Sequence, residues 1–146
     1  MFGNDSKSIL YLDAEGIGCE MLDVWLMANR ENYSVVKASD MADVRQLMAR
    51  KRFCLIIVDD ALLDIGAAEL CRQVRVSDAE SPIVAYTAAK GELDRRRALD
   101  AGADAYLIKP DEFALLGATI NRLLDTVFAS PPPRLHRHRA RSSAII

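Results

Sequence analysis

Residues 53–60 read FCLIIVDD, a continuous apolar run that ends in two aspartates. Continuous apolar runs of this length are typical of strands that are buried on both faces in the middle of a parallel sheet. We therefore predict a central strand over 53–59. Asp59 directly follows the apolar run, and Asp60 faces the opposite side because successive strand residues alternate between faces.

Three further apolar runs end in a polar residue in the same way. Residues 9–12 precede Asp13, residues 83–86 precede Thr87, and residues 106–108 precede Lys109. If the runs are neighbouring parallel strands, their polar ends gather at the carboxyl edge of one sheet, where open α/β folds place their chemistry. Two carboxylates, a hydroxyl and an ammonium at that edge indicate a site for a cation and a phosphoryl group.

Strand-like and helix-like segments alternate along the first 128 residues, which predicts an α/β fold with one five-stranded, doubly wound parallel sheet. Helices are predicted where apolar residues recur at helical spacing, and Gly102 suits the left-handed turn that ends the fourth helix. Ser39 or Asp40 is expected to cap the second helix. The predicted strands cover 8–13, 33–38, 53–59, 82–87 and 104–109, and the predicted helices cover 18–31, 39–52, the segment up to Val76, 90–101 and 113–127.

Two of these helices carry apolar residues whose depth the spacing alone does not settle. We interpret Met21, Trp25 and Met27 as core or near-core residues of the first helix. The fourth helix has a thinner stripe, which consists of Leu93, Arg97 and Leu99.

Length and composition predict one folded domain followed by a tail. The 146 residues are 51% hydrophobic and 27% charged, the balance of a soluble globular protein. We place the domain at 1–129 and predict a disordered tail or linker over 130–146, because prolines 131–133 prevent a helix and the Arg/His/Ser remainder lacks apolar material. All 21 acidic residues precede Ser130, so nucleic acid is not an expected partner of the domain itself.

Several functional classes are disfavoured by residue usage. The cysteines (Cys19, Cys54 and Cys71) are widely spaced beside apolar residues, the pattern of small buried hydrophobes. Both histidines lie in the tail, which argues against Ser–His and Cys–His hydrolysis. The chain has neither a run long enough to cross a bilayer nor a signal peptide, so we expect no membrane contact and a cytoplasmic location.

Four motifs carry a resemblance to a known family. They are ILYLD at 9–13, LIIVDD at 55–60, PIVAYTA at 82–88 and, most specifically, AGADAYLIKP at 101–110. Together they resemble the receiver domain of two-component response regulators, with its flavodoxin-like (βα)5 fold, over Ile9 to Val127. The resemblance implies that Asp59 accepts a phosphoryl group from a phosphohistidine, and that Mg²⁺, Lys109 and Thr87 share the phosphoryl oxygens. It implies a phosphoacceptor signalling domain and no enzyme beyond self-catalysed phosphotransfer and dephosphorylation.

The acidic pair at the first strand departs from the family. Receiver domains carry two adjacent acids there, and the second ligates Mg²⁺ directly; this chain has Asp13 and Ala14, followed by Glu15. Candidate Mg²⁺ ligands are Asp13, Asp59 and the backbone carbonyl of Ala61, with Glu15 as a further candidate. Binding is weakened or absent if nothing compensates for Ala14.

The resemblance also implies a switch and a set of partners. Tyr106 is either the aromatic switch that turns inward when Thr87 is drawn to the phosphoryl group, or an ordinary half-buried strand tyrosine. The expected partners are a sensor histidine kinase or phosphotransfer protein and a downstream protein on the face of the fourth helix, fifth strand and fifth helix, with a homodimer as another candidate assembly. Arg95, Arg96 and Arg97 are either part of that surface or a solvated face.

Two alternatives from other classes stay open. A pseudo-receiver would act as an interaction module without phosphorylation, and Ala14 is the residue that favours it. A small flavodoxin-like enzyme or cofactor-binding protein would share the architecture, since fold does not determine function. The chain has no flavin-sized glycine or aromatic loop that would support the latter.

Overall fold

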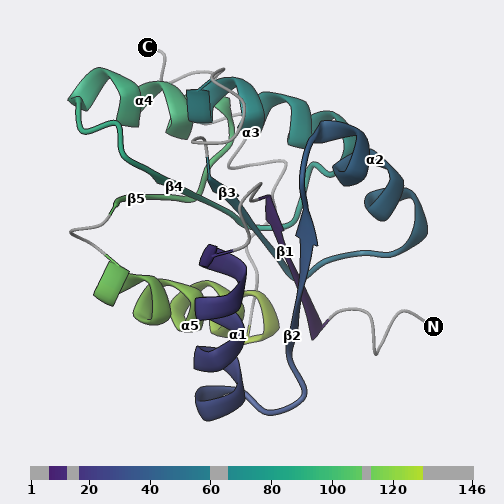
Figure 1. Cartoon of the computed structure of the whole chain (residues 1–146). Helices are drawn as coiled ribbons and strands as arrows, with labels where there is room; N and C mark the ends of the chain where they lie inside the picture. Colours follow the sequence, from purple (N-terminus) through teal and green to yellow (C-terminus); the bar gives the residue numbers. More distant parts are fainter. Residues whose placement is uncertain (1–6, 13–16, 60–65, 110–112, 130–146) are drawn as a thin grey trace.

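The described part of the chain is built around a five-stranded parallel sheet (Figure 1). The computed structural model describes residues 7–12, 17–59, 66–109 and 113–129. The strand order is β2-β1-β3-β4-β5, which confirms the predicted doubly wound α/β fold. The strands are β1 (Ser8–Leu12), β2 (Ser34–Ala38), β3 (Leu55–Asp59), β4 (Ile83–Thr87) and β5 (Ala105–Ile108).

Helices cover both faces of the sheet (Figure 1). One layer holds α1 (Ile17–Asn29) and α5 (Phe113–Ala129), and the other holds α2 (Met41–Arg50), α3 (Gly66–Ser77) and α4 (Glu92–Ala101). Each layer packs its own cluster of buried apolar side chains against the sheet. Among the helices of the described ranges, none combines the length and the hydropathy needed to span a membrane.

The central position of β3 follows from its composition. All five of its residues are buried, as expected of a strand that is apolar toward both helical layers. It pairs with β1 on one side and with β4 on the other, and Asp59 lies opposite Tyr86 in the β3–β4 register. The carboxyl ends of β3 and β4 therefore lie together at one edge of the sheet.

The ends of two helices agree with their sequence signals. Asp40 is the N-cap of α2, and its side chain accepts a hydrogen bond from the backbone N–H of Asp43 at 2.9 Å. Gly102 ends α4 with φ +124°, a conformation that favours glycine. The choice between Ser39 and Asp40 is thus decided for Asp40, and the predicted helix stop is confirmed.

The expected depth of three apolar side chains is wrong. Met21 and Met27 are exposed, Met27 by 79%, and Leu93 is also exposed. The sheet-facing side of α1 is filled by Cys19, Leu22 and Leu26, and the buried residue of α4 is Ala98. Helical spacing predicts which residues share a face of a helix, but it does not predict how closely that helix packs on the sheet. In α4, the small side chain of Ala98 at the contact lets the helix approach the sheet closely.

The three cysteines are free and buried, as predicted. Burial raises the pKa of the Cys54 and Cys71 thiols to about 12, so both are protonated at neutral pH. The Cys54 thiol donates a hydrogen bond to the carbonyl of Ser8 at 3.3 Å. No group of three metal-ligating side chains forms within the described ranges.

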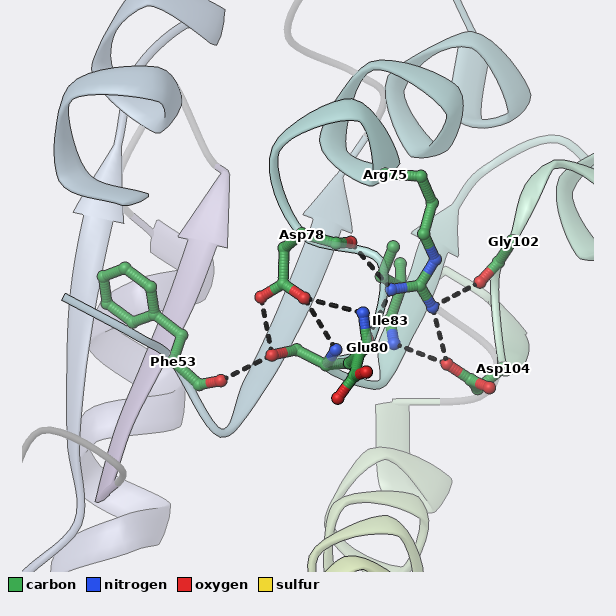
Figure 2. Close-up of polar contacts among 8 residues, drawn as sticks. Phe53, Arg75, Asp78, Glu80, Ile83, Gly102 and Asp104 are labelled. Carbon is green, nitrogen blue, oxygen red and sulfur yellow. Dashed lines mark hydrogen bonds and ion pairs between the residues drawn. The ribbon is translucent and has the colours of Figure 1, made fainter. Parts of the chain in front are cut away.

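A polar network centred on Arg75 joins α3, β4 and the start of β5 at the amino edge of the sheet (Figure 2). The guanidinium donates to the carbonyls of Asp78, Ser81 and Gly102 at 3.1, 2.7 and 2.7 Å, and to the carboxylate of Asp104 at 3.1 Å. The Asp104 side chain is 2% exposed and also accepts from the N–H of Ile83 at 2.9 Å. Arg75 therefore holds together segments that are up to 29 residues apart.

Asp78 extends this amino-edge network to the start of β4. Its carboxylate accepts from the N–H groups of Glu80 and Ser81 at 2.8 Å, and the Ser81 hydroxyl lies 2.7 Å from both Asp78 Oδ2 and the carbonyl of Phe53 (Figure 2). Burial alone would raise the pKa of Asp78, but the hydrogen bonds from Ser81 and Glu80 and the charge of Arg75 outweigh burial and lower it. These contacts tie the end of α3 to the segments that precede β4 and β5.

Candidate functional site

The carboxyl edge of the sheet brings together a carboxylate and an ammonium from residues that are 50 positions apart in the chain. Asp59 ends β3 and is 7% exposed, and Lys109 follows β5 with its N–H donating to the carbonyl of Thr87 at 2.8 Å. The Lys109 ammonium lies 2.7 Å from Asp59 Oδ1. The ammonium and the carboxylate therefore form an ion pair at this edge of the sheet.

The hydroxyl of Thr87 is turned to the backbone that follows β4. Thr87 is fully buried, and its Oγ1 accepts a hydrogen bond from the N–H of Ala89 at 3.1 Å. The Tyr106 hydroxyl donates to the carbonyl of Ala89 at 2.7 Å. The backbone N–H and the backbone carbonyl of Ala89 are therefore hydrogen-bonded to Thr87 and Tyr106, the two residues predicted from the sequence to form a switch.

Tyr106 is buried and borders a groove between α3 and α4. The groove has a volume of about 170 Å³, and its walls include small residues at the start of α3 and two charged residues of α4. The lining residues are Gly66, Ala67, Ala68, Ala89, Asp94, Arg97 and Tyr106.

Comparison with known proteins places this geometry in a family. Residues 9–121 match the family model of the response regulator receiver domain. The chain belongs to the response regulator receiver domain family. This confirms the family that the four motifs predicted and makes the chain a signalling domain of two-component systems.

Curated relatives of this receiver domain are longer than the chain. It is 37% identical to response regulator MprA of Mycobacterium leprae over 92 aligned residues. The alignment covers 63% of this chain and 40% of the relative. The chain is 36% identical over 122 residues to transcriptional regulatory protein GltR of Pseudomonas aeruginosa, which covers 82% of the chain and 50% of the relative. The chain thus spans half or less of the length of these relatives.

Solved receiver structures share the fold. A two-component response regulator from Clostridium difficile matches with a TM-score of 0.72 and 26% identity, covering 82% of this chain and 97% of that one. The receiver domain of sensor histidine kinase PA1611 from Pseudomonas aeruginosa matches with a TM-score of 0.65 and 25% identity, covering 80% and 96%. The latter structure holds a magnesium ion coordinated in its active site cleft.

One of the predicted magnesium ligands of this receiver domain, Asp59, lies within the described residues. Mg²⁺ prefers hard oxygen ligands and is commonly held by one or two carboxylates plus waters, and Asp59 supplies a carboxylate at the base of the edge. The remaining predicted ligands, Asp13, Glu15 and the carbonyl of Ala61, lie outside the described residues, as do Ala14 and Asp60. Asp59 is thus the part of the predicted metal site that the structure places.

One buried side chain at this edge was missed from the sequence. Tyr86 lies opposite Asp59 in the register and is 5% exposed, and its ring centroid is 5.7 Å from the Lys109 ammonium. Burial, and then the charge of Asp59, raise the pKa of its phenol. The sequence signal for Tyr86 was its position directly before Thr87. In a parallel β3–β4 pair, this position lies opposite Asp59.

Proposed function

We propose that Asp59 accepts a phosphoryl group from a phosphohistidine on a sensor histidine kinase or phosphotransfer protein. The observation that carries this proposal is the 2.7 Å contact between Asp59 and Lys109 at the carboxyl edge of a receiver fold. A carboxylate oxygen attacks phosphorus, the P–N bond breaks, and its electron pair returns to the imidazole nitrogen. Most of the catalysis in phosphoryl transfer comes from positioning and charge stabilisation, which the edge residues supply.

Lys109 and Thr87 have separate parts in this step. The Lys109 ammonium is in place to neutralise negative charge that builds up on the phosphoryl oxygens beside Asp59. The buried Thr87 hydroxyl can donate to one of those oxygens after it turns away from Ala89. Bound Mg²⁺, with Asp59, Asp13, the Ala61 carbonyl and Glu15 as its candidate ligands, would neutralise further charge on the same oxygens.

We infer that the signal leaves the site through Ala89. Thr87 holds the N–H of Ala89 and Tyr106 holds its carbonyl, so turning Thr87 toward a phosphoryl group releases one of two restraints on this residue. The segment leads directly into α4, whose N-cap residue Gly91 makes no side-chain cap. We propose that the first turn of α4 shifts when this restraint is released.

The surface next to this segment suits a protein partner. α4 exposes Arg95, Arg96 and Arg97 together with the apolar Leu93, and α5 exposes Leu115. We propose that a downstream protein, or a second copy in a homodimer, binds the face of α4, β5 and α5. The proposed receiver domain ends at 129, at the end of α5, and the proposed tail or linker over 130–146 lies outside the described residues.

The test is phosphorylation by the small donor phosphoramidate in the presence of Mg²⁺, followed by intact-protein mass spectrometry. We expect one phosphoryl group on the wild type and on Asp60→Asn, and none on Asp59→Asn. Asp60→Asn is a matched control for Asp59→Asn, because the two residues are adjacent and each substitution removes one negative charge. Uptake by Asp59→Asn but not by Asp60→Asn would assign the acceptor role to Asp60.

A second candidate function is a pseudo-receiver that signals by binding alone. The observation that favours it is Ala14, which supplies no ligand where the family has a second acid. The same experiment separates the two functions. A folded wild-type protein that takes up no phosphoryl group at any Mg²⁺ concentration would establish the pseudo-receiver.

A further inference from the structure

Three side chains lie together at the carboxyl edge of the sheet. The β3–β4 register aligns Asp59 with Tyr86, and the β4–β5 register aligns Tyr86 with Leu107. Lys109 follows β5, and its ammonium contacts both the Asp59 carboxylate and the Tyr86 ring. Tyr86 lies on the strand between the carboxylate and the ammonium.

The Tyr86 ring is fixed in the core beneath the lysine. It is 5% exposed and belongs to the buried cluster that packs against α1 and α5, which includes Val84 and Leu107. The Lys109 ammonium is 5.7 Å from the ring centroid and 2.7 Å from Asp59 Oδ1. A cation at this distance from an aromatic face is attracted by the negative charge of the π system.

The contact with the Tyr86 ring restricts the position of the Lys109 ammonium. Lys109 is 24% exposed and has a flexible four-carbon stem, so without support its ammonium exchanges between the carboxylate and water. The ring is rigid and cannot compete with Asp59 as an anion, because burial and the charge of Asp59 keep its phenol neutral at physiological pH.

We propose that Tyr86 is a positioning residue, whose buried ring holds the Lys109 ammonium against Asp59 so that the charge is in place when the phosphoryl group arrives. This proposal rests on the proposed phosphoryl transfer to Asp59. Tyr86 acts through Lys109 and is not assigned a contact with the reacting atoms. Its aromatic face, and not its hydroxyl, carries the effect.

The first measurement reads the contact in the unphosphorylated protein. The methylene protons next to the Lys109 ammonium are expected to show an upfield ring-current shift in ¹H–¹³C NMR spectra. We expect Tyr86→Phe to retain this shift and Tyr86→Leu to lose it. Leu124→Val, which alters the same buried layer away from the site, is a control for packing loss and is expected to leave the shift in place. An unchanged shift in Tyr86→Leu would overturn the proposal.

The second measurement is the rate of Asp59 phosphorylation by phosphoramidate. We expect a roughly fivefold loss in Tyr86→Leu, the scale of a cation–π contact to a partly exposed ammonium, and a rate near that of the wild type in Tyr86→Phe. In a Lys109→Met background, Tyr86→Leu is expected to cause no further loss. An equal loss with and without Lys109 would show a purely structural role and overturn the proposal.

The two measurements separate this inference from the proposed function. If the folded wild type takes up no phosphoryl group, the proposed function fails, and the ring-current shift still decides whether Tyr86 holds Lys109. If phosphorylation proceeds and Tyr86→Leu changes neither the shift nor the rate, only the role of Tyr86 fails.

Discussion

The two edges of the sheet hold their charges in opposite ways. At the amino edge, Arg75 is surrounded by acceptors from four residues, and the Asp104 carboxylate it contacts is almost completely buried (Figure 2). At the carboxyl edge, the Lys109 ammonium that contacts Asp59 remains partly open to water. The comparison indicates that the polar groups at the amino edge stabilise the fold, whereas we propose that those at the carboxyl edge receive a phosphoryl group.

The largest effect on stability is expected from breaking the amino edge. Arg75→Met removes the guanidinium and leaves the buried Asp104 carboxylate without its counter-charge, which should cost about 3 kcal/mol of unfolding free energy. Arg72→Met on the same helix removes an exposed ion pair with Glu69 and should cost less than about 0.5 kcal/mol. Urea denaturation measures the unfolding free energy of both variants. Equal losses in the two variants would contradict a stabilising role of the amino edge.

A smaller loss is expected from Gly102→Ala. The residue has φ +124°, and an added Cβ would lie 2.8 Å from Cγ and Nε of Arg75. Backbone strain and displacement of the Arg75 side chain should together cost about 2 kcal/mol. Gly91→Ala at the N-cap of the same helix, where φ is −73° and the nearest atom is the flexible Asp94 carboxylate, is the control. It should lose only the better capping of glycine, about 0.5 kcal/mol to 1 kcal/mol, in the same urea titration. Equal losses would show that the clash at Arg75 has no effect.

Asp78 gives the amino edge a defined dependence on pH. Its pKa is lowered in the folded state, so its contribution to stability is present above the ordinary value of 3.8 and is lost as the pH falls through the folded pKa. Asp78→Asn should therefore be less stable than the wild type by about 1 kcal/mol at neutral pH. The difference should shrink below about pH 4. Thermal unfolding of both proteins from neutral to acidic pH would detect it, and a constant difference would contradict the assignment.

The smallest effect on stability is expected at the carboxyl edge. Asp59→Asn should change the unfolding free energy by less than about 1 kcal/mol, because Lys109 can turn its ammonium to water once the carboxylate charge is gone. The same substitution is the one expected to abolish phosphorylation. A loss as large as that of Arg75→Met would mean that both edges are structural.

The sequence predicted the fold because β3 and its neighbours are continuous apolar runs whose polar ends mark one edge of a parallel sheet. It also predicted that Asp59 and Lys109 would meet, since both follow strands of that sheet. It did not predict the role of Arg75, because its acceptors are mostly backbone carbonyls, which any sequence supplies. The exposure of Met21 and Met27 was missed because α1 is apolar on its outward side as well.

The measurement that tests the difference between the two edges most directly is an amide NMR titration with Mg²⁺ and then beryllofluoride, a mimic of the acyl phosphate. We predict saturable shifts at Thr87, Ala89, Tyr106 and Lys109, loss of those shifts in Asp59→Asn, and little change at Gly102 and Asp104. The absence of shifts at the carboxyl edge of a folded protein, or equally large shifts at Gly102 and Asp104, would contradict this account. The account requires that the carboxyl edge responds to the phosphoryl mimic and that the amino edge does not.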